Sequence, residues 1–140
     1  MFKKILVAVD GSPDADRAVH AAMDLAGGQG SEVTLCHVSY IPERYHGDLL
    51  AGITEAVTED GRRILEHAER VAEQNGVDVA TRLLTTGHPA EAILKLADEL
   101  GAGLIVVGVK GKSADAPTDL GSVSAAITQR ASCSVLLVRR

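Results

Sequence analysis

The chain opens with Lys4-Ile5-Leu6-Val7-Ala8-Val9-Asp10-Gly11-Ser12-Pro13, a stretch that changes character halfway. Its first part, Ile5 to Val9, is a short apolar run bounded by turn residues, which predicts a buried strand. Ser12 then suits the N-cap of a helix, with Pro13 in its first position. A strand that turns directly into a helix is the first half of a βαβ unit.

The same succession recurs along the chain. After the first strand, further strands are expected at 32–38, 77–84, 104–107 and 134–138, and helices at 13–27, 54–75, 89–100 and from 121 or 122 onward. Residues 40–53 are ambiguous, because Pro42, Gly47 and Gly52 interrupt any long pattern, and they suit a mobile loop or a short helix. Alternating strands and helices predict an α/β fold with a parallel sheet.

Composition agrees with a single domain over residues 1–140. Hydrophobic residues make up 46% of the chain and aromatic residues only 2%. A core of small aliphatic residues suits a parallel sheet with helices on both faces. The net charge of −5 disfavours nucleic-acid binding, which depends on clustered Lys and Arg. No apolar run is long enough for a membrane span, so we expect a cytoplasmic protein without membrane insertion. Cys36 and Cys133 lie in apolar runs and are expected as buried, reduced thiols.

Two segments carry residues suited to ligand binding. In an open parallel sheet, ligands bind beyond the carboxyl ends of the strands, where the strand order reverses. The first segment is Val9-Asp10-Gly11-Ser12, and the second runs from Gly108 and Lys110 to Gly121-Ser122. Glycines let main-chain N–H groups approach an anion closely, and a helix start favours phosphate. Glycines also end strands for purely structural reasons, and that alternative stays open.

Two familiar phosphate-binding motifs are excluded. Gly111-Lys112-Ser113 imitates the end of a P-loop, but the required first glycine would fall at Val106. Gly101 and Gly103 cannot begin a Rossmann fingerprint, because they precede the fourth strand rather than follow it.

The spacing Gly108-x2-Gly111-x9-Gly121-Ser122 resembles the ATP-binding signature of the universal stress protein family. The stretches 4–12, 87–93 and 121–139 resemble the first strand and turn, the third helix start and the last helix and strand of that family. The resemblance implies a three-layer α/β/α, Rossmann-like fold with a five-stranded parallel sheet of order 3-2-1-4-5. It also implies a homodimer that pairs through the last strand, residues 134–138.

The resemblance further implies a role for each part of the site. Asp10 contacts the ribose or adenine end, while Ala8 and Val38 flank adenine and the Val38 backbone reads its edge. Val107 and Gly108 lie near the sugar. The phosphates are held by Gly111, Gly121, Ser122 and Val123. The candidate nucleotide-binding residues are Ala8, Val9, Asp10, Val38, Val107, Gly108, Lys110, Gly111, Gly121, Ser122 and Val123.

The segment between the last two glycines is acidic. Asp115 and Asp119 could hold Mg²⁺ against the phosphates or simply face water, and both interpretations stay open. No His spacing suits a metal; His88, at a helix start, could touch a ligand, and His46, in the ambiguous segment, could line the adenine side. Catalytic residues cannot be named. We therefore expect an ATP-binding regulatory or signalling dimer in the stress response, with an unidentified protein partner; a slow ATPase or nucleotide-dependent enzyme and a nucleotide-free dimeric interaction protein are the alternatives.

Overall fold

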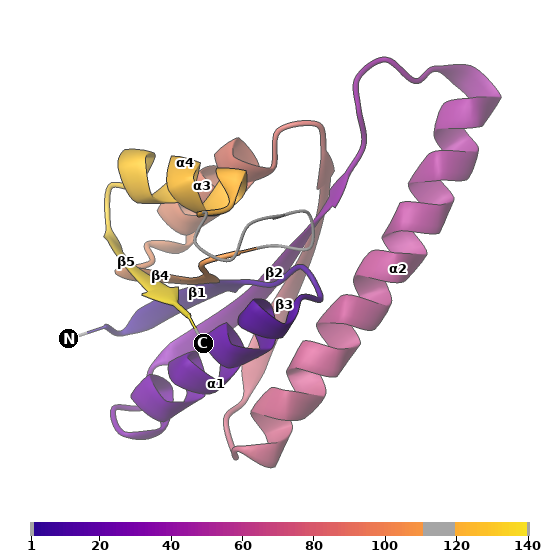
Figure 1. Cartoon of the computed structure of the whole chain (residues 1–140). Helices are drawn as coiled ribbons and strands as arrows, with labels where there is room; N and C mark the ends of the chain where they lie inside the picture. Colours follow the sequence, from indigo (N-terminus) through magenta and orange to yellow (C-terminus); the bar gives the residue numbers. More distant parts are fainter. Residues whose placement is uncertain (1, 111–119, 140) are drawn as a thin grey trace.

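A five-stranded parallel sheet forms the centre of the molecule. The computed structural model describes residues 2–110 and 120–139. The strands are β1 (Lys4–Ala8), β2 (Glu32–Tyr40), β3 (Val79–Thr86), β4 (Leu104–Gly108) and β5 (Ser134–Val138). Their order in the sheet is β3-β2-β1-β4-β5, and every neighbouring pair is parallel. The predicted fold class and strand order are confirmed (Figure 1).

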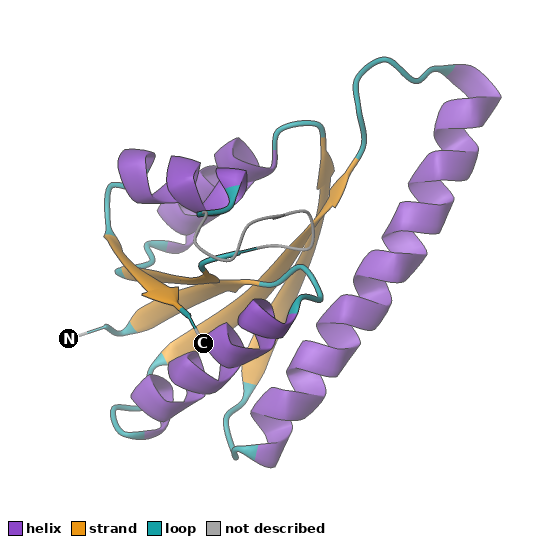
Figure 2. Ribbon diagram, in the orientation of Figure 1, coloured by secondary structure: helices purple, strands orange, loops and turns teal. Residues whose placement is uncertain are grey.

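Helices cover both faces of this sheet. They are α1 (Pro13–Gly27), α2 (Gly47–Gln74), α3 (Pro89–Leu100) and α4 (Ser122–Arg130). Helices α1 and α2 lie on one face, and α3 and α4 lie on the other, which gives three layers (Figure 2). None of these helices in the described part of the chain combines the length and apolarity needed to cross a bilayer.

Alternation along the strands divides the core in two. Ile5 and Val7 pack with α1 and α2, whereas Leu6, between them, packs with α3 and α4. Successive side chains of a strand point to opposite faces, so this division continues to the strand ends. Val9 therefore belongs to the α1/α2 side, and Ala8 belongs to the α3/α4 side.

The second helix is longer than the sequence predicted. It begins at Gly47 rather than at residue 54, so the irregular connection is only 41–46. None of residues 47–60 is buried, while Gly61, Leu65, Ala68 and Ala72 all are. An exposed helical glycine such as Gly52 costs about 1 kcal/mol relative to alanine, which the packed second half can offset by helix propagation.

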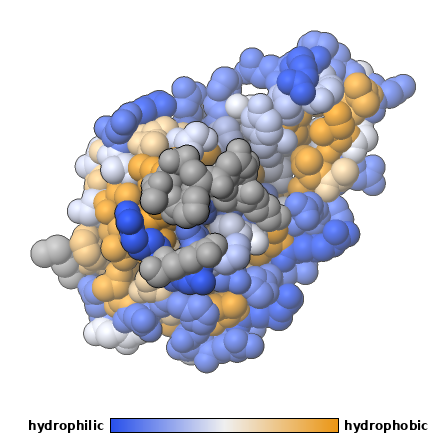
Figure 3. Space-filling view, in the orientation of Figure 1, coloured by the Kyte–Doolittle hydropathy of each residue, from blue (hydrophilic) through white to orange (hydrophobic). Residues whose placement is uncertain are grey.

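The projecting first half of α2 carries apolar surface. Leu49 is 61% exposed, and Figure 3 shows an apolar strip along this part of the helix. At the other end of α2, the third strand begins two residues later than predicted, at Val79. Val77 belongs instead to the helix end, because its N–H donates to the Ala72 carbonyl. Both cysteines are free thiols; Cys36 is buried as expected, whereas Cys133 is only partly buried.

Candidate functional site

The turn after β1 is fixed by its own side chains. The Ser12 Oγ accepts a hydrogen bond from the Ala15 N–H at 3.1 Å and so caps α1, as predicted. The Ser12 N–H in turn donates to Asp10 Oδ1 at 2.9 Å. Gly11 has a φ of 81°, a left-handed conformation that favours glycine. This turn places Asp10 at the carboxyl edge of the sheet.

The end of β4 meets the first turn of α1. The Lys110 N–H donates to Asp14 Oδ2 at 3.3 Å, and the Ser12 Oγ donates to the Lys110 carbonyl at 3.4 Å. A Cβ on Gly108 would lie 2.7 Å from the Asp14 Cβ. Gly108 therefore has a structural task, the close packing of α1 on β4, and this supports the alternative that the sequence left open for it. The two predicted segments do converge at one edge.

The start of α4 is tied to the same strand end. Gly121 is the N-cap of α4, and its N–H donates to the Val109 carbonyl at 2.9 Å. The Ser124 Oγ donates to the Gly108 carbonyl at 2.7 Å. The first N–H groups of a helix have no partner within the helix. Because the Gly121 amide is already engaged, the amides of Ser122 and Val123 are the stronger candidates for an anion.

An apolar wall lies beside these amides. Ala8, Val38, Val107 and Val123 all belong to the core on the α3/α4 side of the sheet. They come from the ends of β1, β2 and β4 and from the first turn of α4. The strand order brings Ala8, Val38 and Val107 together next to the Asp10 turn, and the packing of α4 adds Val123.

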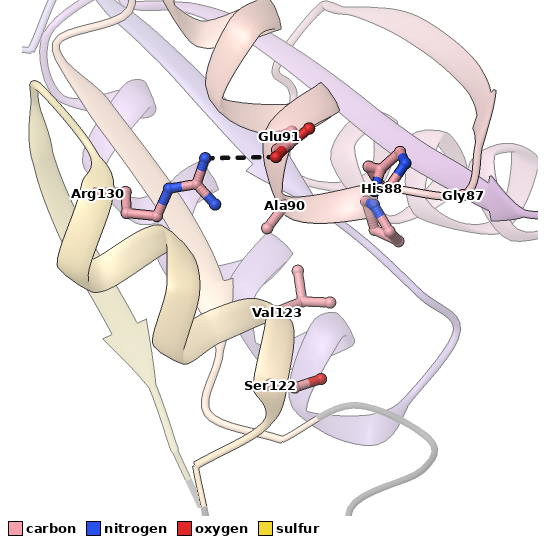
Figure 4. A pocket seen from close by; sticks show the side chains of 8 residues that line it. Gly87, His88, Ala90, Glu91, Ser122, Val123 and Arg130 are labelled. Atoms are coloured by element: carbon pink, nitrogen blue, oxygen red, sulfur yellow. Dashed lines mark ion pairs between the residues drawn. The ribbon is translucent and has the colours of Figure 1, made fainter.

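A cavity of about 270 Å³ opens between the starts of α3 and α4 (Figure 4). Two of the predicted site residues, Ser122 and Val123, line it together with the segment Gly87–Glu91 and with Arg130. The Arg130 guanidinium and the Glu91 carboxylate lie 3.8 Å apart across its rim. The predicted site residues from β1, β2 and β4 do not line this cavity, so it adjoins the strand ends rather than containing them.

The sequence singled out His88 alone in the segment Gly87–Glu91. Its Nε2 lies 2.7 Å from Glu43 Oε1, which links the start of α3 to the 41–46 connection. The hydrogen bond that the protonated His88 ring donates to Glu43, followed by the negative charge of that carboxylate, raises the pKa of His88. In the sequence, the turn residues Gly87 and Pro89 indicated a helix start in this segment, but they did not indicate that the segment lines a cavity.

Three residues close to the site were missed as functional candidates. Asp14 and Ser124 hold the two helix starts against β4, as described above. His37 on β2 is buried, and its Nδ1 lies 2.7 Å from the Val9 carbonyl oxygen. Their residue types occur widely in helices and strands, so nothing in the sequence separated them from ordinary core and surface positions.

Some predictions fall outside the described residues. Gly111 and the acidic pair Asp115 and Asp119 lie in the undescribed segment 111–119. Within residues 2–110 and 120–139, no group of three or more His, Cys, Asp or Glu side chains could hold a metal ion. The metal interpretation of the acidic segment therefore stays a prediction.

Comparison with known proteins gives consistent relatives. The model of the universal stress protein family matches residues 1–139. The universal stress protein YxiE of Bacillus subtilis is 38% identical, over 99% of this chain and 100% of its own length. A universal stress protein of Thermus aquaticus is 39% identical over the same shares of the two chains.

Solved structures share the fold. The structure of hypothetical protein MJ0577 has a TM-score of 0.87 and 29% identity, covering 100% of this chain and 97% of that chain. A universal stress protein in complex with cAMP has a TM-score of 0.76 and 28% identity, covering 98% and 97%. The protein from Archaeoglobus fulgidus in complex with dAMP has a TM-score of 0.73 and 27% identity, covering 96% of each chain. From its sequence and its architecture together, the chain belongs to the universal stress protein family.

Proposed function

We propose that this protein binds ATP, with Mg²⁺, at the carboxyl edge of β1 and β4. The observation that carries the proposal is the convergence of the Asp10 turn, the end of β4 and the start of α4 through the Ser12–Lys110 and Ser124–Gly108 hydrogen bonds. Ligands of open parallel sheets bind at such an edge, where strand order reverses.

The surroundings suit the three parts of a nucleotide. The amides of Ser122 and Val123, at the positive end of α4, are placed for phosphate oxygens. In the apolar wall, Ala8, Val38 and Val123 are only partly buried and offer a surface for adenine, whereas Val107 is 4% exposed. Asp10 is the acceptor for ribose hydroxyls. Mg²⁺, when bound, would neutralise phosphate charge through phosphate oxygens and water.

Two structural relatives support an adenine nucleotide. One was solved with cAMP and another with dAMP. Both are below 30% identity to this chain, so they support the class of ligand rather than the length of its phosphate chain. ATP remains our choice because the glycine spacing of this sequence resembles the ATP-binding signature of the family.

For the whole protein, we propose a single-domain, cytoplasmic, homodimeric regulator. The described chain pairs β5 on one side only, with β4, and Leu136 on it is 36% exposed. An apolar strand with an open edge favours pairing with a second copy. The candidate residues include donors and an apolar wall but no assigned general base, which favours a binding role over an enzymatic one.

The test is a thermal-shift and calorimetric series with ATP, ADP, AMP and cAMP, each with and without Mg²⁺. A ligand that binds only the folded protein raises its stability by mass action. We expect a rise with ATP that grows with its concentration. No shift at millimolar ATP would leave the nucleotide-free dimer, and fast multiple-turnover ATP hydrolysis in the same samples would favour the enzyme.

A further inference from the structure

His37 occupies an unusual place at the end of the β1–β2 ladder. The side chain is 8% exposed and lies on the α1/α2 side of β2, where Gly61 of α2 packs against it. A Cβ on Gly61 would lie 2.9 Å from His37 Cδ2, so the helix holds the ring closely. A carbonyl oxygen can only accept, so the contact of His37 Nδ1 with Val9 places the ring proton on Nδ1.

The His37 imidazole takes the place of one main-chain hydrogen bond between β1 and β2. Ala8 pairs with Cys36, and the Val9 N–H still donates to the Cys36 carbonyl at 2.8 Å. In a parallel ladder, the following bond would run from the Val38 N–H to the Val9 carbonyl. Among the hydrogen bonds of the described residues, that carbonyl accepts from His37 and from no main-chain N–H.

Two consequences follow for the sheet edge. Both main-chain polar groups of Val9, immediately before Asp10, are engaged by β2: the N–H donates to the Cys36 carbonyl, and the carbonyl accepts from the His37 ring. The Val38 N–H stays outside the β1–β2 ladder, and it points toward the β1 side because main-chain groups of a strand alternate in direction. Val38 also belongs to the apolar wall of the candidate site.

We infer that His37 is a positioning residue for the base end of the nucleotide. Because His37 donates to the Val9 carbonyl, the Val38 N–H remains available to the hydrogen-bonding edge of adenine. The same hydrogen bond fixes the main chain immediately before Asp10. This inference rests on the proposed nucleotide function. His37 itself touches no ligand, since its ring lies on the opposite face of the sheet from the apolar wall.

The test compares ATP with GTP, which differ only in the base. Removal of the Nδ1 donor by His37→Leu allows Val9 and Val38 to pair, so we expect the preference for ATP over GTP to fall about tenfold, or about 1.4 kcal/mol. The amide nitrogen of asparagine can replace Nδ1, whereas glutamine places its amide farther out. His37→Asn should keep the preference, and His37→Gln should lose it.

A matched control separates positioning from stability. Val33 lies on the same strand and on the same α1/α2 face of the sheet, toward the opposite end of β2. Val33→Ala should lower the urea midpoint of unfolding while leaving the ATP:GTP ratio unchanged. Calorimetry gives the affinities for ATP and for GTP of each variant that folds. If His37→Leu does not fold, the comparison of His37→Asn with His37→Gln still tests the role of His37.

The outcomes distinguish the inference from the proposed function. If the wild-type protein binds no nucleotide, the proposed function fails. If it binds ATP but binds GTP equally well, or if His37→Leu or His37→Gln keeps the wild-type ratio, the role of His37 is overturned while nucleotide binding stands.

Discussion

Gly108 and Asp14 lie so close that a β-carbon on residue 108 would be 2.7 Å from the Asp14 Cβ and 2.8 Å from its carbonyl carbon. The contact joins the end of β4 to the first turn of α1, where backbone atoms cannot move aside as a flexible side chain can. It thereby sets the distance between the two segments of the candidate site.

The first prediction concerns this contact. Gly108→Ala should destabilise the protein by about 1–3 kcal/mol, because overpacking forces backbone shifts. Urea unfolding measures the change. Gly103→Ala is the control, since its Cβ would meet only Phe2 Cδ1, at an ordinary 3.8 Å. Equal stability of the two variants would show that α1 is not held at Gly108.

The second prediction isolates one amide at the start of α4. Proline is tolerated at the first helical position and removes its N–H, and Gly121, with φ −60° and ψ 151°, is already compatible with a following proline. Ser122→Pro should weaken ATP binding about tenfold relative to Ser122→Ala, since hydrogen bonds to charged groups contribute about 1.5–3 kcal/mol. Calorimetry compares the two variants, both of which lack the hydroxyl. Matching affinities would mean that the phosphates lie elsewhere.

A third prediction addresses the edge of β5. The Val138 carbonyl accepts from the Val109 N–H, so the main chain of Val138 faces β4 and that of Val135 faces outward. Val135→Pro removes an outward N–H without breaking the β4–β5 ladder. It should raise the dimer dissociation constant by about tenfold or more over Val135→Ala, because two-fold symmetry removes the bond twice. Sedimentation velocity measures the shift, and an unchanged dimer would place the interface elsewhere.

The fourth prediction is the titration of His88. Glu43 raises the pKa of His88 above its ordinary 6.5, mainly by a hydrogen bond. The pair therefore stabilises the folded protein fully below pH 6.5, and this contribution is lost as pH rises through the raised pKa. In an NMR titration, Glu43→Gln should lower the His88 pKa more than Glu91→Gln does, because Glu91 acts only through its charge. The reverse order would contradict the Glu43–His88 hydrogen bond.

Local sequence signals predicted the sheet well. Each of these signals depends on residues that are close together in the sequence. They are the apolar run before Asp10, the Ser12 cap and the alternation of strands and helices. The predicted start of α2 was wrong because Gly47 and Gly52 normally disfavour a helix. The packed second half of α2 compensates for the free-energy cost of these glycines.

The site was predicted less completely, since its finer features depend on contacts between distant segments. The packing reason for Gly108 needs Asp14, which is 94 positions earlier in the chain, and the engagement of the Gly121 amide needs the Val109 carbonyl. The sequence places His37 in a strand, but its contact with the Val9 carbonyl joins residues 28 positions apart, which no local signal indicates.

The two halves of α2 should exchange their amide hydrogens by different routes. Residues 61–74 are anchored by four buried positions, whereas residues 47–60 have none. Segments with few buried contacts open locally, at a free energy well below that of global unfolding. The amino-terminal turns of this helix can therefore fray and re-form while the sheet stays intact, as far as Val57, whose carbonyl accepts a hydrogen bond from Ser39 of β2 one turn before Gly61 and the His37 ring behind it.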